Sequence, residues 1–140
     1  MSKPVVVAAG LLFRDGKLLI TQRPAGGHLA GLWEFPGGKQ EPGEAIEATV
    51  ERELQEELAI EVEVTEPLIS LDHAYSHKRL RFEVFLCRWL SGEPQPLASQ
   101  QVRWVHPTGL AAFPFPAANA RIIAALLQRF GHSEGSSKVA

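Results

Sequence analysis

The chain is short of cysteine and of net charge, and each shortage excludes a class of protein. Cys87 is the single cysteine among 140 residues, so no internal disulfide can form, and it lies in the apolar run FEVFLCRWL. We expect it to pack as a small buried side chain in a reducing compartment. The formal net charge is only −2, whereas a general duplex-binding protein carries a basic surplus. We therefore expect no stable nucleic-acid partner.

Long apolar runs are also missing. No segment approaches the roughly 20 apolar residues that cross a bilayer. The first apolar run contains Pro4 and ends in a charged turn at residues 14–16. It lacks a small-residue cleavage site, so it is not interpreted as a signal peptide. We expect a cytoplasmic protein with no membrane partner, present as a monomer or weak dimer.

The length and composition are those of one globular domain. A chain of 140 residues with 45% hydrophobic side chains can bury a core without disulfides. We predict a single domain over residues 1–131. The polar residues 132–140 are predicted to form a flexible C-terminal tail.

The pattern of apolar residues predicts alternating strands and helices. Asp15-Gly16 separates two β-rich runs and predicts a two-residue hairpin. Residues 24–44 are rich in glycine and proline and are predicted to be mostly loop, with a short strand at 33–35. The other predicted strands are 4–13, 18–23, 61–72, 78–90 and 102–106, and the other predicted helical segments are 107–112 and 117–130. This order indicates an α/β fold with a mixed sheet.

An acidic helix is the most unusual feature of the sequence. Residues 37–60 hold seven glutamates, one lysine and one arginine. Apolar residues at i+4 steps, from Ile46 to Leu58, predict the packed face of a helix that starts after residues 42–44 and ends near Ala59. Solvated helices usually place Lys or Arg at i+4 from Glu to relieve repulsion, and here only Arg52 can do so.

Three carboxylates of this helix can meet on one side. Glu53, Glu56 and Glu57 are three or four residues apart, so their side chains project from neighbouring positions. Mg²⁺ takes oxygen ligands and is usually shared between carboxylates and substrate phosphates. The pattern predicts a metal–phosphate site, and the alternative is a solvated helix rich in glutamate for solubility.

The same segment resembles the signature of the Nudix hydrolases. The matching residues are Gly38, Glu44, Arg52-Glu53-Leu54-Gln55-Glu56-Glu57 and Ile60, at the signature's spacing. One position departs, because Ala59 stands where the family has glycine. The glycine usually supplies a left-handed turn after the helix, and we expect a small geometric adjustment there.

The resemblance implies a fold, a reaction and a set of roles. The fold is a Nudix-like α/β/α sandwich with a mixed central sheet, and the reaction is hydrolysis of a nucleoside diphosphate linked to another group. The cofactor is Mg²⁺, with Mn²⁺ as a possible substitute. The implied metal ligands are Glu53, Glu56, Glu57 and the carbonyl of Gly37, with Glu53 also a candidate base.

Two further residues of the signature have implied supporting roles. Arg52 would pair with the carboxylates and orient them, and the alternative is a surface ion pair with Glu56. Glu44 would be a supporting ligand or carboxylate.

Segments outside the signature resemble the MutT-type members of the family, which hydrolyse oxidised purine nucleoside triphosphates. These segments are ITQRPAGGHLAGLWEFPGGK and FPFPAANARIIAALL. The resemblance implies that Asn119 reads the base, since an amide offers a donor and an acceptor to a purine edge. The alternative is that Asn119 caps the helix that follows it.

The remaining substrate residues follow from position and chemistry. Arg23 matches a substrate-contacting arginine and can pair with phosphate, although an ordinary surface charge is the alternative. His28 is a phosphate donor or a plain loop histidine. Phe35 is expected to offer backbone groups while its ring packs, Tyr75 to stack on the base or pack in the core, and Lys78 to lend charge or backbone groups.

Other functions stay open at this point. MutT-type enzymes commonly carry a glutamate in the loop before the late strand, and this chain has Ala98-Ser99-Gln100 there. The segment AGLWEFPGGK also resembles enzymes that act on CTP and modified pyrimidine triphosphates. A third alternative is a non-catalytic domain that reads oxidised guanine. Hydrolysis of 8-oxo-dGTP to the monophosphate and pyrophosphate is the leading prediction.

Overall fold

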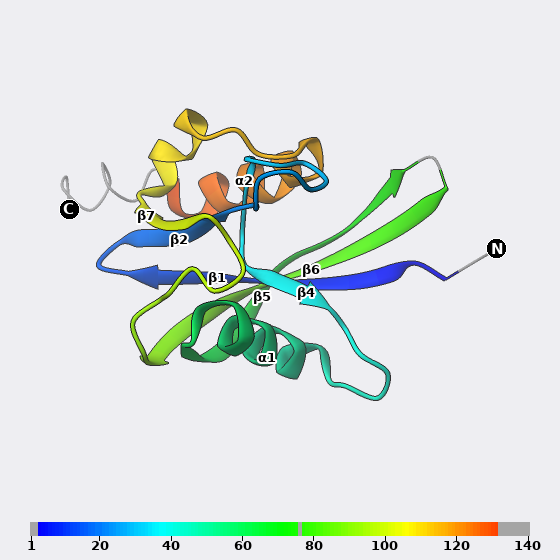
Figure 1. The fold of residues 1–140 in the computed structure, drawn as a ribbon, viewed down its shortest axis with the longest axis horizontal. Helices are drawn as coiled ribbons and strands as arrows, with labels where there is room; N and C mark the ends of the chain where they lie inside the picture. Colours follow the sequence, from blue (N-terminus) through cyan, green and yellow to red (C-terminus); the bar gives the residue numbers. More distant parts are fainter. Residues whose placement is uncertain (1–2, 76, 132–140) are drawn as a thin grey trace.

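A mixed β-sheet forms the centre of the molecule, with helices on both faces (Figure 1). The computed structural model describes residues 3–75 and 77–131, so the predicted tail at 132–140 lies outside the described residues. Strand order runs β3-β2-β1-β6-β5, with β4 paired to β1 and β7 paired to β2. β1 and β6 pair in parallel and the other pairs are antiparallel. The prediction of an α/β/α sandwich with a mixed sheet is confirmed.

The strands occupy the apolar runs of the sequence. Their bounds are β1 Val5–Arg14, β2 Lys17–Gln22, β3 Trp33–Glu34, β4 Gly37–Lys39, β5 Glu61–Tyr75, β6 Lys78–Ser91 and β7 Gln101–Val105. The turn between β1 and β2 is the predicted two-residue hairpin. Asp15 and Gly16 both have positive φ, 53° and 77°, which is the type I′ geometry that fits the twist of the strands.

One face of the sheet is covered by α1 (Ile46–Leu58), which lies below the sheet in Figure 1. Val50, Leu54 and Leu58 are fully buried against the sheet, as their i+4 spacing predicts. Cys87 belongs to this core, and burial raises the pKa of its thiol to about 12. The prediction that Cys87 packs as a small buried side chain is confirmed.

The other face carries the C-terminal helical segments. They are the 3-10 turns η1 (Pro107–Ala112) and η2 (Ala117–Asn119), the helix α2 (Ala120–Leu126) and the π turn η3 (Leu127–Gly131). Ile122 and Leu126 are buried in the core on this side.

Two predictions about elements are corrected. Residues 117–130 do not form one continuous α-helix, because a 3-10 turn precedes α2 and a π turn follows it, in which Phe130 packs against Phe13. The segment 24–44 also contains a strand that was predicted as loop. Gly37–Lys39 forms β4 by pairing with β1, and local glycine propensity hides such long-range pairing.

Ala59, which stands where the family has glycine, adopts a left-handed backbone conformation. Ala59 caps α1 in the left-handed conformation, with φ 58° and ψ 38°, and its N–H donates to the carbonyl of Gln55. A side chain with a Cβ is strained there, at a cost of about 1–2 kcal/mol. The chain therefore keeps the backbone geometry of the glycine turn and bears the strain.

Ala59→Gly should stabilise the protein. Relief of the left-handed strain outweighs the extra freedom of glycine in the unfolded chain, which costs about 0.4–1 kcal/mol. We expect the Tm to rise by about 1–4 °C, since 1 kcal/mol moves the Tm of a domain of this size by about 2–4 °C. Thermal unfolding measures this Tm, and kcat should stay unchanged. A lower Tm than that of the wild type would contradict the prediction.

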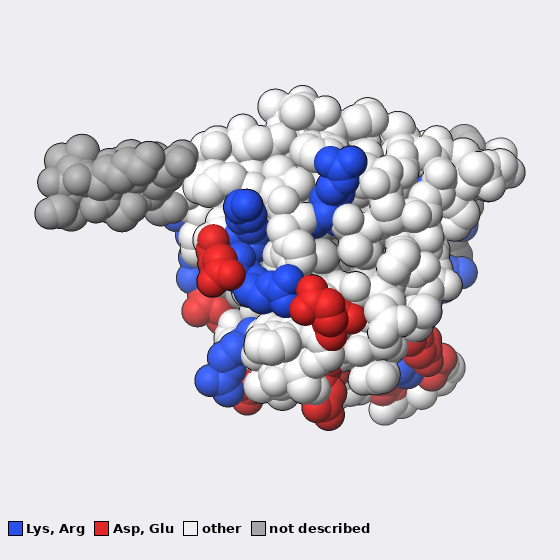
Figure 2. All heavy atoms as spheres, turned by 60° about the vertical axis from the view of Figure 1, so that its left-hand side comes forward, with Lys and Arg blue, Asp and Glu red and all other residues white. Residues whose placement is uncertain are grey.

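Two observations concern membrane and nucleic-acid partners. Among the described residues, no helix is both long and apolar enough to span a bilayer. On the face drawn in Figure 2, basic and acidic side chains lie next to one another and most of the surface is uncharged. Arg23 and Lys78 line the pocket described below.

Candidate active site

The carboxylate of Glu53 lies directly against β4. A Cβ built on Gly38 would come within 2.3 Å of the Glu53 carboxyl carbon, so only glycine leaves room for this side chain. The Glu53 side chain is 16% exposed. The glycine of the signature therefore has a steric reason in this structure.

Arg52 lies at the centre of a group of carboxylates on and before α1, which we call the acidic cluster: Glu44, Glu53, Glu56 and Glu57. Its Nε and Nη2 donate to both oxygens of Glu44, at 2.7 and 3.1 Å, and Nη1 donates to Glu53 at 2.9 Å and Glu56 at 3.2 Å. Nη2 also donates to the carbonyl of Lys39 at 3.0 Å. Arg52 thus ties α1 to the loop before it, which is far more than the surface pair with Glu56 that was its alternative.

Glu44 serves this network as an acceptor. Besides Arg52, its Oε1 accepts from the hydroxyl of Thr49 at 2.8 Å and from the N–H of Glu41 at 3.0 Å. The hydrogen bonds from Arg52 are the main reason that the pKa of Glu44 falls to about 2. Both oxygens of Glu44 are engaged by the protein, and its predicted supporting role stays a prediction.

The pKa of Glu57 is shifted upward, in the opposite direction to that of Glu44. Burial raises the pKa of its carboxyl to about 9, with further contributions from a hydrogen bond to Glu53 and from the charges of Glu53 and Glu34. Its Oε1 accepts from the N–H of Gly37 at 3.4 Å. A proton on Glu57 would therefore reduce the repulsion between Glu57 and the neighbouring carboxylates.

These residues fit a hard divalent cation by their chemistry. Glu53 and Glu57 are close, partly buried oxygen donors beside the β4 backbone, and a cation would replace the proton that Glu57 holds. No three His, Cys, Asp or Glu side chains of residues 3–75 and 77–131 converge as a ready metal site. Arg52 donates hydrogen bonds to Glu53 and Glu56, and the three predicted ligands stay a prediction.

Removing the charge of Glu57 should stabilise the metal-free protein at alkaline pH. Above pH 4.5 the unfolded chain releases this proton while the folded protein keeps it up to about pH 9, so stability falls with rising pH in that window. In EDTA at pH 8, Glu57→Gln should raise the Tm by about 2–6 °C. The gain should shrink toward pH 5.

The matched control for this experiment is Glu47→Gln. Glu47 lies exposed in the first turn of the same helix, so its neutralisation should leave the pH dependence of the Tm unchanged. Added Mg²⁺ should raise the Tm of the wild type more than that of Glu57→Gln. An equal Tm for wild type and Glu57→Gln at pH 8 would show that Glu57 is not protonated there.

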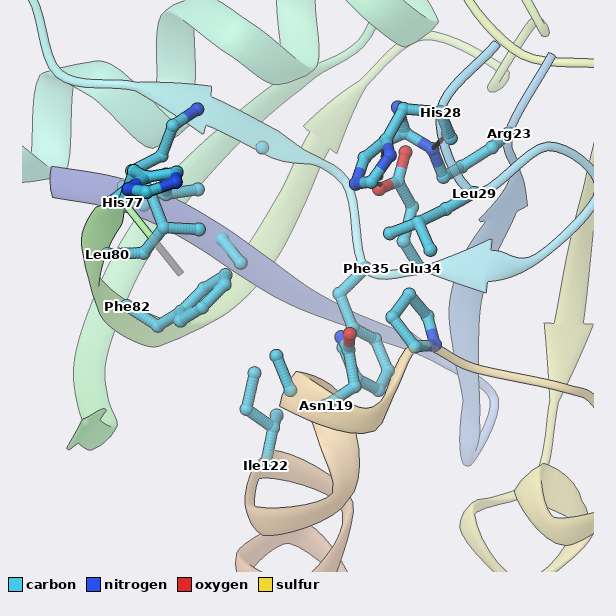
Figure 3. A pocket seen from close by; sticks show the side chains of 17 residues that line it. Arg23, His28, Leu29, Glu34, Phe35, His77, Leu80, Phe82, Asn119 and Ile122 are labelled. Atoms are coloured by element: carbon cyan, nitrogen blue, oxygen red, sulfur yellow. Dashed lines mark hydrogen bonds and ion pairs between the residues drawn. The ribbon is translucent and has the colours of Figure 1, made fainter. Parts of the chain in front are cut away.

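A pocket opens beside the acidic cluster, on the other side of β4. Its volume is about 550 Å³, within the size range of small-ligand sites. Figure 3 shows three walls: Arg23, His28 and Glu34 on one, His77, Leu80 and Phe82 on another, and Asn119 and Ile122 on the third. Gly37 lines the pocket, and its N–H also donates to Glu57, so the pocket and the acidic cluster adjoin at this residue.

The pocket collects most of the predicted substrate residues. Arg23, His28, Phe35, Lys78 and Asn119 all line it. The ring of Phe35 is buried and stacks on Phe115, with 5.2 Å between ring centroids, so the prediction that this ring packs is confirmed. Tyr75 ends β5, and its side chain lies outside what the structure describes.

Asn119 does not use its side chain to cap α2. It occupies the N-cap position without a side-chain hydrogen bond. The residue is 9% exposed, and its amide has no hydrogen-bond partner among the described residues. Among the described residues no fully buried side-chain N or O lacks a partner, so the Asn119 amide atoms are accessible. The free amide faces the pocket in Figure 3, so helix capping does not explain it.

Several pocket residues were not predicted as site residues. Leu80 and Phe82 lie near the start of β6, within the predicted strand 78–90, and both line the pocket. Glu34 and His77 also line the pocket. Their neighbours Phe35 and Lys78 were predicted, so adjacency in the sequence was a signal that could have found them.

The late loop reaches the C-terminal end of α1. The N–H of Leu97 donates to the carbonyl of Glu57 at 3.1 Å, and Gln100 donates from Nε2 to the carbonyl of Arg23 at 2.9 Å. The loop therefore contacts both α1, at Glu57, and the pocket residue Arg23. It offers an amide from Gln100 and no carboxylate at Ala98.

The chain matches a known family over most of its length. The model of the NUDIX domain matches residues 8–125, and the chain belongs to the Nudix family. Members of the family generally use divalent metal ions. The chain is an enzyme of this family, and the alternative of a non-catalytic base-reading domain is set aside.

Similar proteins define the type more closely. The CTP pyrophosphohydrolase and the 8-oxo-dGTP diphosphatase of Escherichia coli strain K12 are each 35% identical over 125 residues, covering 89% of this chain and 93% and 97% of theirs. The MutT Nudix hydrolase of Burkholderia pseudomallei has a crystal structure with a TM-score of 0.77 at 31% identity, covering 87% of this chain and 96% of that one. The chain is a MutT-type Nudix hydrolase, a pyrophosphohydrolase.

Proposed function

We propose that the enzyme hydrolyses 8-oxo-dGTP to 8-oxo-dGMP and pyrophosphate. The observation that carries this proposal is the free amide of Asn119 in the apolar part of the pocket. An amide can pair with a purine edge as donor and acceptor together. The pocket connects at Gly37 to the carboxylates, so a base at Asn119 and a phosphate chain at Glu53 and Glu57 belong to one ligand.

The acidic cluster would supply the reaction centre. Glu53, Glu56, Glu57 and the Gly37 carbonyl would hold Mg²⁺, which would neutralise phosphate charge and acidify a water. Glu53 would take the proton of that water as it attacks phosphorus and the anhydride bond breaks. Arg52 orients Glu53 through its hydrogen bond, and Glu44 holds Arg52. Arg23, His28 and Lys78 would face the phosphates.

Relative specificity tests the substrate. We expect kcat/KM with Mg²⁺ to be highest for 8-oxo-dGTP in a comparison with dGTP, CTP and 5-methyl-dCTP. The products of 8-oxo-dGTP should be the monophosphate and pyrophosphate, each formed once per turnover. A higher kcat/KM for CTP would overturn the assignment of the base.

Asn119→Ala should remove the discrimination between 8-oxo-dGTP and dGTP. A buried polar group left without its partner costs about 1–3 kcal/mol, so kcat/KM for 8-oxo-dGTP should fall about 10-fold or more and that for dGTP less. Asn119→Ser is the control, because serine is also a good N-cap residue and yet lacks the amide. If both variants lose only thermal stability, the side chain is structural.

The second candidate is a CTP pyrophosphohydrolase. The relative with that name matches this chain at the same identity and over the same length as the 8-oxo-dGTP diphosphatase of the same organism. Pyrimidines also present a donor and an acceptor that an amide can read. The same comparison of nucleotides separates the two candidates.

A further inference from the structure

We propose that Glu34 is a positioning residue, which holds the guanidinium of Arg23 so that its Nη2 stays available to a substrate phosphate. Glu34 is not part of the acidic signature and comes from a different element, β3. The inference rests on the proposed function in taking a nucleoside triphosphate as the substrate and Arg23 as a contact of its phosphates.

The guanidinium of Arg23 is held from two sides. Its Nη1 donates to Oε1 of Glu34 at 3.0 Å, and its Nε donates to the carbonyl of His28 at 2.9 Å. Its Nη2 has no partner among the residues that the structure describes. Arg23 and Glu34 both line the pocket (Figure 3). Two of the three guanidinium nitrogens are thus held by the protein, and Nη2 is left for a ligand.

The position of Glu34 follows from strand pairing. β3 pairs with β2 so that Glu34 lies opposite Thr21, two residues before Arg23. The side chains of Arg23 and Glu34 are 31% and 35% exposed, so the pair is partly shielded by the pocket walls. A guanidinium with a fixed orientation loses less entropy for each hydrogen bond it makes to phosphate.

The backbone of Arg23 is fixed as well. Its N–H donates to the carbonyl of Leu32, and its carbonyl accepts from Gly31 and from Nε2 of Gln100. Because the backbone cannot shift freely, the direction of the guanidinium depends on its side-chain partners. The two partners are the carbonyl of His28 and the carboxylate of Glu34, and only Glu34 is charged.

Steady-state kinetics of Glu34→Ala tests this role on whichever nucleotide the wild type hydrolyses best. We expect KM to rise about 10-fold, the value of one charge-assisted hydrogen bond, with kcat within about threefold of the wild type. Arg23→Ala should raise KM at least as much, and the double variant should add little to it. Glu34→Gln keeps an acceptor near Nη1 and should recover part of the loss.

Glu93→Gln is the matched control. Glu93 accepts two hydrogen bonds from Arg14, both 3.0 Å, at a surface ion pair outside the pocket. The control should leave KM and kcat unchanged. It also serves if Glu34→Ala folds poorly, because Glu34→Gln can then be compared with it directly.

The outcomes are distinct. Independent, additive effects of Arg23→Ala and Glu34→Ala on KM would overturn the inference, as would an unchanged KM in Glu34→Ala. A turnover number that drops about 100-fold or more at constant KM would make Glu34 a catalytic group instead. If the wild type hydrolyses none of the nucleotides, the proposed function fails, and this result is separate from any effect of Glu34.

Discussion

Glu53→Gln is expected to reduce kcat by about 10²–10⁴-fold, the range that a general base contributes. Glutamine has nearly the same shape as glutamate, but its amide carries no charge and cannot accept the proton of the attacking water. The side chain would still fill the space beside Gly38. Because the change removes one of several crowded carboxylates, the Tm of the metal-free protein should not fall.

Single-turnover hydrolysis measures this loss without the complication of product release. Glu47→Gln is the control, since Glu47 lies on the exposed first turn of the same helix and its replacement removes the same charge. It should hydrolyse the substrate at nearly the wild-type rate. Turnover of Glu53→Gln within a few-fold of the wild type would remove Glu53 from the mechanism and direct the search for the base to Glu57 or Glu56.

The sequence predicted the elements whose signals are local. The turn Asp15-Gly16 marks a hairpin by itself, and the i+4 row from Val50 to Leu58 marks a buried helix face whatever lies opposite. Both are present in the structure. The acidic positions were also visible, because repulsion along a helix is a property of neighbouring residues.

Features made by distant segments could not be predicted. β4 exists because Gly37, Gly38 and Lys39 pair with Ala9, Ala8 and Val7 of β1, and glycine gives no strand signal of its own. The break of the last helix is likewise a matter of tertiary packing. Residues of low local propensity, such as those of β4, adopt regular structure only where a partner strand is present.

The pocket could not be predicted for the same reason, because its residues come from distant segments. Leu80 and Phe82 reach it from β6, Glu34 from β3 and Asn119 from the turn before α2. Each has an ordinary structural explanation within its own segment. Their common role is apparent only when the sheet brings the segments together, whereas the carboxylates of α1 are already neighbours in the sequence.

Gly38→Ala is expected to reduce kcat by about 100-fold, which is the effect of misplacing a catalytic group by about 1 Å. The added Cβ would lie 2.3 to 2.5 Å from the three carboxyl atoms of Glu53, so the carboxylate must move away from β4. Its hydrogen bond from Arg52 at 2.9 Å would be disturbed with it. Steady-state turnover at saturating substrate and Mg²⁺ measures the loss.

Gly43→Ala separates this effect from a general loss of stability. Gly43 lies in the loop before α1 with φ 77°, and an added Cβ there would meet nothing within 4 Å. The left-handed conformation makes alanine costly by about 1–2 kcal/mol, so this control should lower the Tm while kcat stays near the wild-type value. If Gly38→Ala loses stability and keeps its kcat, the close approach of Gly38 to Glu53 serves the fold alone, because the position of the carboxylate would then not limit the reaction.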